Sequence, residues 1–183
     1  MAYKSDDGNE EEEVSESEMN NRMVMARCSF QILYNLPCCP GVDNQGNVNP
    51  DALRTYIYRL YELSVERHRS QVTDMVVGSL LGNLPRNDSY PQTILGEIVE
   101  ELKSDSVDEH IRMRIFNSRG VTTRAFAEGG DQERSLVALF KSYRDKVKFT
   151  YPRLAKIFTK LMSEYERDAN REDCVAQLED LEY

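Results

Sequence analysis

The sequence has no long hydrophobic run and few cysteines. None of its apolar stretches approaches the roughly 20 residues that a membrane-spanning helix requires, and none has the form of a signal-peptide core. The four cysteines, Cys28, Cys38, Cys39 and Cys174, lack disulfide-framework spacing, and the adjacent Cys38 and Cys39 fit neither a CxxC redox motif nor a zinc knuckle. These absences predict a soluble, cytoplasmic protein with reduced thiols.

Patterns that carry catalysis or bind metals are missing as well. There are only two histidines, His68 and His110, and neither has a glutamate three residues before it, so the di-iron Glu-x-x-His pattern is absent. The HExxH, GxSxG and GxxxxGK[ST] motifs are absent too, as is a GxGxxG that follows a strand. The sequence therefore predicts a protein that is not an enzyme and that has no cofactor and no metal site.

The strongest composition bias lies at the N-terminus. Residues 1–18 hold eight carboxylates and one lysine, a formal charge of −7, whereas the whole chain has a formal charge of −9. Such a segment has almost no apolar surface to bury, so residues 1–18 are predicted to form a disordered acidic tail. Residues 19–183, which are close to neutral, are predicted to form one helical domain.

Helical periodicity dominates the domain. Apolar residues recur at spacings of three and four, and no β-branched run alternates between turn signals, so we expect an all-α fold of six or seven amphipathic helices. Asn49 before Pro50 is a strong helix start, and Ser106 with Glu109 has the spacing of a capping box. The small residues Gly78 and Ser79 would permit a close helix crossing. The apolar face of the first helix is expected to carry Met19, Met23, Ala26, Phe30 and Leu33.

Tyrosine is abundant, with ten residues, and tryptophan is absent. Tyrosines on helix seams usually lie at the edge of the core, where the ring is buried and the hydroxyl finds a partner. Because tyrosine is also enriched at interface hot spots, some of them could instead belong to a partner-binding surface. Both interpretations stay open, with the core edge favoured.

A Gly-rich loop with arginines interrupts the helical pattern at residues 116–134. From 111 to 127 the chain has four arginines and no carboxylate, and a glycine pair then leads into the helix expected to start at Asp131. Such a pair permits positive φ and close backbone approach, and amides at a helix start can bind an anion. Arg112 and Arg114 would face different sides of their helix. The candidate interaction residues are Arg112, Arg114, Asn117, Arg119, Arg124, Gly129, Gly130 and Arg134.

Three interpretations of this loop compete. The first is a connection that is held in place by internal salt bridges, with Asp131 capping the next helix. The second is a surface that receives an acidic segment, from a partner protein or from this chain's own tail. The third is phosphate or nucleic-acid binding, although no aromatic interleaving beyond Phe116 and Phe126 accompanies the four arginines.

Several short runs, FNSRGV, GGDQER, YPR at 151–153 and YERDA at 165–169, resemble a helical module of bacterial proteins that forms the end of larger multidomain chains. The resemblance covers residues 107–173 and reaches more weakly back to residue 50. It implies a bacterial or phage source and a module that works beside other domains, and it carries over no catalytic residue. The leading hypothesis is therefore an adaptor that docks on a larger bacterial protein assembly through the loop. A nucleic-acid- or phosphate-binding regulator that uses the same arginines is the alternative.

Overall fold

The computed structural model describes residues 15–34, 39–66, 70–120, 123 and 128–179, apart from the side chains of Phe30, Ile32, Leu33, Tyr34 and Glu179. Within these ranges the chain forms seven helices and no strand, with one isolated antiparallel bridge between Val42 and Val48. The all-α prediction is therefore confirmed. The helices are α1 (Glu16–Tyr34), α2 (Pro50–Glu66), α3 (Ser70–Gly82), α4 (Thr93–Leu102), α5 (Asp105–Asn117), α6 (Asp131–Val147) and α7 (Pro152–Glu179).

Helix starts agree with the sequence at some positions and differ at others. The backbone amide of Ala52 donates to Asn49 Oδ1 at 3.1 Å, so the predicted cap of α2 is confirmed. The predicted capping box at Ser106 is wrong, because α5 begins two residues earlier, with Ser104 as its cap. Ser104 Oγ accepts from the amide of Val107 at 3.2 Å and donates to Asp74 Oδ2 at 2.6 Å. The hydrogen bond from Ser104 to α3 thus explains why Ser104 is the cap, whereas local spacing alone favoured Ser106.

The close helix crossing predicted around Gly78 is found in the structure. α3 lies across α5, and a Cβ placed on Gly78 would come within 2.5 Å of His110 Cβ and 2.7 Å of the Val107 carbonyl oxygen. One turn later, a Cβ on Gly82 would lie 2.7 Å from Arg114 Cβ. Only glycine allows this separation at these two positions, which are spaced as GxxxG on one side of α3.

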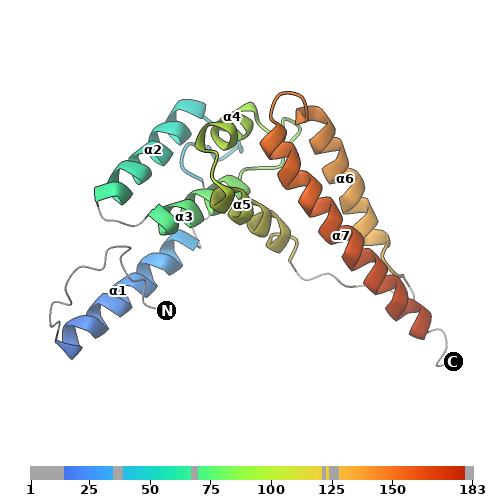
Figure 1. The fold of residues 1–183 in the computed structure, drawn as a ribbon, viewed down its shortest axis with the longest axis horizontal. Helices are drawn as coiled ribbons and strands as arrows, with labels where there is room; N and C mark the ends of the chain where they lie inside the picture. Colours follow the sequence, from blue (N-terminus) through green and yellow to red (C-terminus); the bar gives the residue numbers. More distant parts are fainter. Residues whose placement is uncertain (1–14, 35–38, 67–69, 121–122, 124–127, 180–183) are drawn as a thin grey trace.

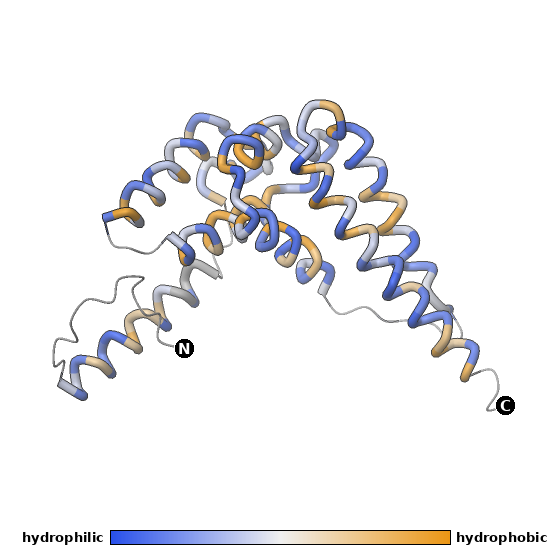
Figure 2. The backbone as a smooth tube through the Cα atoms, viewed as in Figure 1, coloured by the Kyte–Doolittle hydropathy of each residue, from blue (hydrophilic) through white to orange (hydrophobic). Residues whose placement is uncertain are grey.

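Helices α6 and α7 form an antiparallel hairpin that packs against α5 and α4 (Figure 1). Its interior is aromatic: the rings of Phe140 and Tyr165 stack at 5.7 Å. The same cluster includes Phe158, Tyr90, Tyr143 and Phe116. Tyr90 and Tyr165 are fully buried, so the core interpretation of the tyrosines holds for both. Figure 2 shows hydrophobic residues gathered where α3, α5 and the hairpin meet.

Helix α1 does not join this core. It projects from the body, and its only substantial contact with another helix is with α3 (Figure 1). Every described side chain from Ser15 to Ser29 is exposed, including Met19 at 54% and Met23 at 50%. The predicted helix of α1 is confirmed, but Met19, Met23 and Ala26 of its apolar stripe are exposed, so this part of the stripe does not join a compact body as expected. The side chains of Phe30 and Leu33 lie outside the described residues. The acidic tail assigned to 1–18 lies mostly outside the described residues, and Glu16–Glu18 belong to α1.

Candidate functional site

The Arg/Gly-rich loop runs from the end of α5 to the start of α6, and we call residues 118–130 the hinge. Glycine conformation matters at its second end. Gly129 has φ +62°, and Gly130 lies so close to α7 that an added Cβ would meet the Ala169 carbonyl oxygen at 2.4 Å. The glycine pair therefore serves a close backbone approach between the hinge and α7, as one of the two roles expected for it.

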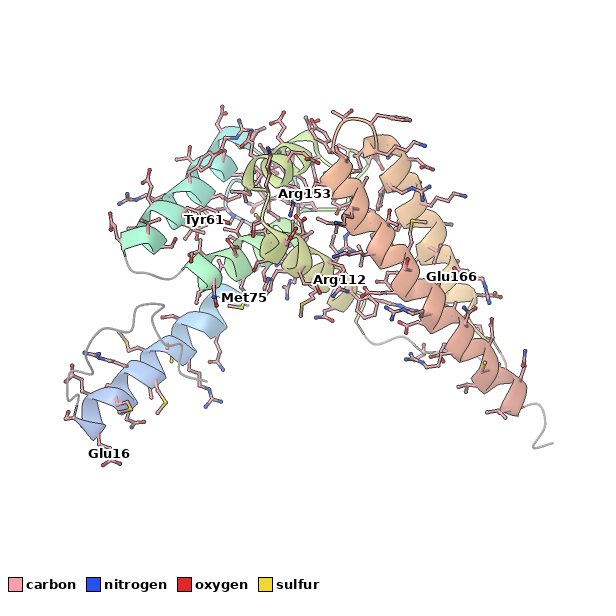
Figure 3. All side chains as sticks on the ribbon, in the orientation of Figure 1. Glu16, Tyr61, Met75, Arg112, Arg153 and Glu166 are labelled. Carbon is pink, nitrogen blue, oxygen red and sulfur yellow. The ribbon has the colours of Figure 1, made fainter. Side chains whose placement is uncertain are left out.

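Arg112 connects α5 with α7 (Figure 3). Its guanidinium forms ion pairs with Glu109 on its own helix and with Glu164 on α7, and its side chain is only 15% exposed. The hydrogen bond to Glu109 raises the pKa of Arg112, and the same bond lowers the pKa of Glu109. The charge of Arg112 is thus used to hold α5 against α7.

Arg114 points the other way. Its Nε donates to Asn83 Oδ1 at 2.6 Å, at the end of α3, while its Cβ lies against Gly82. The prediction that Arg112 and Arg114 face different partners is therefore confirmed. Asn117, the last residue of α5, is exposed.

The side chain of Arg119 extends from the hinge into the protein interior. Its guanidinium lies 2.5 Å from Glu133 Oε1, and Glu133 is fully buried. It also donates to Gln132 Oε1 at 3.4 Å and lies 5.9 Å from the centre of the Tyr165 ring. A buried carboxylate requires a paired charge, so Arg119 and Glu133 form a polar link between the hinge, the first turn of α6 and the aromatic core.

Asp173 of α7 anchors the start of α6. Its Oδ1 accepts the Gly130 amide at 2.8 Å, and its carboxylate pairs with Arg134. The hydrogen bond from Arg134, followed by the one from Gly130, lowers the pKa of Asp173, and the pKa of Arg134 is raised in turn. The amide of Gly130 therefore does bind an anion, and that anion is a carboxylate of the same chain.

The structure thus brings most of the predicted interaction residues into internal contacts. Arg112, Arg119 and Arg134 pair with carboxylates, Arg114 binds Asn83, and the two glycines pack on α7. Arg124 lies outside the described residues. The carboxylates come from α5, α6 and α7, beyond the acid-free window, so the sequence around the loop did not reveal them. The geometry favours the interpretation of the loop as a connection fixed by salt bridges. The cap expected from Asp131 is wrong, because Gly130 is the N-cap of α6 and Asp131 is already its first residue.

A second basic region, outside the loop, lies in the α6–α7 hairpin. Residues 134–163 contain eight lysines and arginines and a single carboxylate, Asp145, a formal charge of +7. A charge count along the chain would have found it. Phe149, at the turn of the hairpin, is 91% exposed, and Lys148 Nζ lies 5.1 Å from the centre of its ring. Among the described residues, Lys141 and Lys156 form no ion pair.

Part of this positive charge is used inside the fold. Arg153 Nε lies 2.8 Å from Asp108 Oδ2, and its guanidinium also pairs with Asp105 at 2.5 Å. Burial raises the pKa of Asp108 to about 6, although Arg153 acts in the opposite direction. Asp108 is only 8% exposed, so this pair ties α5 to the start of α7 at the expense of a partly desolvated carboxylate.

An open groove of about 350 Å³ lies beside Arg112, between α5 and α7. Thr159 and Ser163 contribute hydroxyls to its lining, which otherwise holds four cations and two carboxylates. The charged residues are Arg112, Lys156, Lys160, Arg167, Glu109 and Glu164. The groove therefore carries a formal charge of +2 and suits a small anion better than an apolar ligand.

The described part of the chain gives no sign of a metal site, because nowhere in it do three or more His, Cys, Asp or Glu side chains gather. Cys39 is buried and Cys28 and Cys174 are exposed, while Cys38 and His68 lie outside the described residues. Among the described helices, none combines the length and the hydropathy that a membrane crossing requires. Comparison of the chain with protein-family models, curated proteins and solved structures gives no significant match.

Proposed function

We propose that the protein is a non-enzymatic interaction module that docks on a larger protein, and that α1 is its docking element. In the adaptor role that the resemblance implies, the larger protein would be a bacterial cytoplasmic assembly. The observation that carries the proposal is the exposure of α1: this helix of 19 residues presents Met19, Met23, Val24 and Met25 to solvent.

Physical reasoning favours a partner for α1. Helices shorter than about 12–15 residues are marginal in water, and longer ones still depend mostly on the packing of an apolar face. None of the described side chains of α1 is buried, and its main contact with another helix is with α3. Methionine side chains are flexible and polarizable, which suits a surface that adapts to a partner.

The hinge takes a supporting role in this proposal. Arg119 of the hinge, and Arg112 and Arg134 on the helices beside it, are paired internally, so they retain little charge to offer an acidic partner. Their pairs hold α5, α6 and α7 together and so maintain the body from which α1 projects.

Affinity purification from the native host tests the proposal with three versions of the full chain. The wild type and Met113→Glu are expected to recover the same partner, because Met113 is an exposed methionine of α5 at 43%. Met19→Glu/Met23→Glu is expected to lose it while its circular dichroism keeps the signal of the helical body. Retention of every wild-type partner by the double variant would refute α1 as the docking element.

A second candidate function rests on the basic hairpin. Its charge of +7 and the groove beside Lys156 favour phosphate or nucleic-acid binding, as the alternative hypothesis holds. A gel shift between about 50 and 200 mM salt should then show steeply falling affinity, and Lys141→Glu/Lys156→Glu should weaken it further. Absence of binding to duplex DNA, single strands and RNA at the lowest salt would eliminate this candidate.

A further inference from the structure

We infer that the partner of α1 is a single α-helix whose apolar seam is flanked by acidic residues, and that the two helices pair as a short coiled coil. The inference rests on the proposed function, because it names the class of partner that docks on α1. It depends on the spacing of the apolar residues in α1, on their exposure, and on the charges at the edges of that stripe.

The apolar residues of α1 follow a heptad pattern. Met19, Met23 and Ala26 are spaced by four and three, and all three are exposed on one side of the helix. The sequence continues the same spacing to Phe30 and Leu33, whose side chains lie outside the described part. This places Met23 and Phe30 at a positions and Met19, Ala26 and Leu33 at d positions of a seam that spans two heptads. A seam of that kind fits one facing helix.

The flanks of the seam carry positive charge only. In this register Arg22 occupies a g position and Arg27 an e position, while Asn20 and Ser29 fill neighbouring flanking positions without charge. Arg22 pairs with Glu18 at 3.0 Å, but both side chains are more than half exposed, so the pair is weak and easily exchanged. Arg27 forms no ion pair within the described ranges. Residues at e and g determine partner choice in coiled coils, so this seam favours a partner helix with glutamates at its flanks.

The same charges disfavour pairing with a second copy of the chain. A parallel pair of α1 helices would place Arg22 of one copy against Arg27 of the other, because g faces the e position five residues later. An antiparallel pair aligned over residues 23–33 would place Arg27 against its own equivalent. Like charges at these positions are destabilising, so self-association is disfavoured in these two arrangements.

Binding to two synthetic peptides tests the inference with the full-length protein. Each peptide has three heptads with Ile at a and Leu at d, and carries either Glu or Lys at every e and g position. Neither pairs strongly with itself, because its flanks repel. Fluorescence anisotropy of the labelled peptides gives the affinities, and Met23→Glu measures binding that does not involve the seam, such as Lys-peptide attracted by the acidic residues 1–18.

We expect the seam-dependent affinity for the Glu-peptide to exceed that for the Lys-peptide roughly tenfold, as two opposite-charge contacts replace two repulsive ones. Arg22→Glu/Arg27→Glu should reverse the preference, and Arg22→Lys/Arg27→Lys should retain it. Equal seam-dependent binding of both peptides, or none at concentrations up to the millimolar range, would overturn the inference. So would sedimentation of the wild type as a dimer that Met23→Glu dissociates, because a second copy would then occupy the seam.

The purification experiment separates this inference from the function on which it rests. If Met19→Glu/Met23→Glu loses the native partner but Arg22→Glu/Arg27→Glu keeps it, α1 docks without an acidic-flanked helix and only the inference fails. If both variants keep the partner, the proposed function fails. Loss in both variants, together with the peptide preference, supports both.

Discussion

Replacement of Arg119 by alanine tests whether the hinge is held by its internal ion pair. In the native protein Glu133 is fully buried and the guanidinium of Arg119 lies 2.5 Å from its carboxylate. The substitution removes this positive charge and the contact of Arg119 with the Tyr165 ring, but it leaves the acid in place. The expected result is a large loss of stability from a single substitution in the hinge.

The size of this loss follows from two limits. Removal of one partner from a buried ion pair costs about 3–5 kcal/mol. Protonation of the acid sets a ceiling, because neutralising a glutamate with an ordinary pKa of about 4.3 costs roughly 3.7 kcal/mol at pH 7. We therefore expect Arg119→Ala to lower the free energy of unfolding by about 3 kcal/mol at pH 7.

The pH dependence gives the result a signature. A lower pH neutralises carboxylates, so it should relieve the cost of a buried acid that has lost its arginine. The loss relative to the wild type should therefore shrink by up to about 1.4 kcal/mol per pH unit between pH 7 and pH 5. A general packing defect would show no such change.

Urea unfolding of the wild type and three variants, followed by circular dichroism at pH 5, 6 and 7, provides the measurement. Arg171→Ala is the control, because Arg171 is 68% exposed and its pairs with Asp168 and Glu172 are expected to contribute less than about 1 kcal/mol. Arg119→Met/Glu133→Gln should recover much of the loss, since the buried charge of Glu133 is then removed together with that of Arg119. A loss below about 1 kcal/mol in Arg119→Ala, or one that is independent of pH, would refute the reasoning.

Three further substitutions have defined outcomes. Gly78→Ala should destabilise the protein by about 1–3 kcal/mol despite its better helix propensity, because its Cβ would lie 2.5 Å from that of His110; a thermal midpoint no lower than that of Ser79→Ala would contradict this. Asp108→Asn should change how stability depends on pH. Because the pKa of Asp108 is raised to about 6, the stability of the wild type should fall by at most about 3 kcal/mol as the pH rises from about 4 to 6. Urea unfolding of the variant should not show this fall. Ser104→Ala should cost about 1 kcal/mol or more by the same assay, whereas Ser106→Ala should have little effect.

The fold class and the order of helices were predictable because they follow from local rules. Apolar spacing, the Asn49–Pro50 start and the small residues on α3 each act within a few residues of the chain, and each is found in the structure. The cap of α5 was not predictable, because Ser104 and Ser106 have similar local contexts and only the hydrogen bond from Ser104 to Asp74 distinguishes them. Burial of Met19, Met23 and Ala26 was wrongly expected for a related reason: an amphipathic stripe predicts a helix but does not state what covers its apolar face.

The candidate site was predictable in part. The sequence indicated that the hinge glycines permit close backbone approach and that Arg112 and Arg114 diverge, and both statements hold. It did not indicate where the arginines find their acids, since Glu164 and Asp173 lie 52 and 39 residues from Arg112 and Arg134 in the chain. An acid-free window in sequence is therefore a poor measure of free positive charge in a folded protein. Fewer of the hairpin lysines form internal ion pairs, so free positive charge is better sought among them.

The contrast between the hinge and α1 leads to one further expectation about the docked state. Among the described residues of the hinge, Arg119 and the Gly130 amide bind carboxylates inside the body, so a partner has little to gain from them, whereas α1 keeps apolar surface exposed that a partner could remove from water. Because α1 is packed mainly against α3, its amides should exchange with solvent faster than those of α5 and α7 in the free protein. An occupant of the seam should slow exchange in α1 and leave α5 and α7 unchanged, since it stabilises that helix alone. Hydrogen exchange with and without the Glu-flanked peptide measures this, and protection confined to the hinge would show that the docking surface lies there after all.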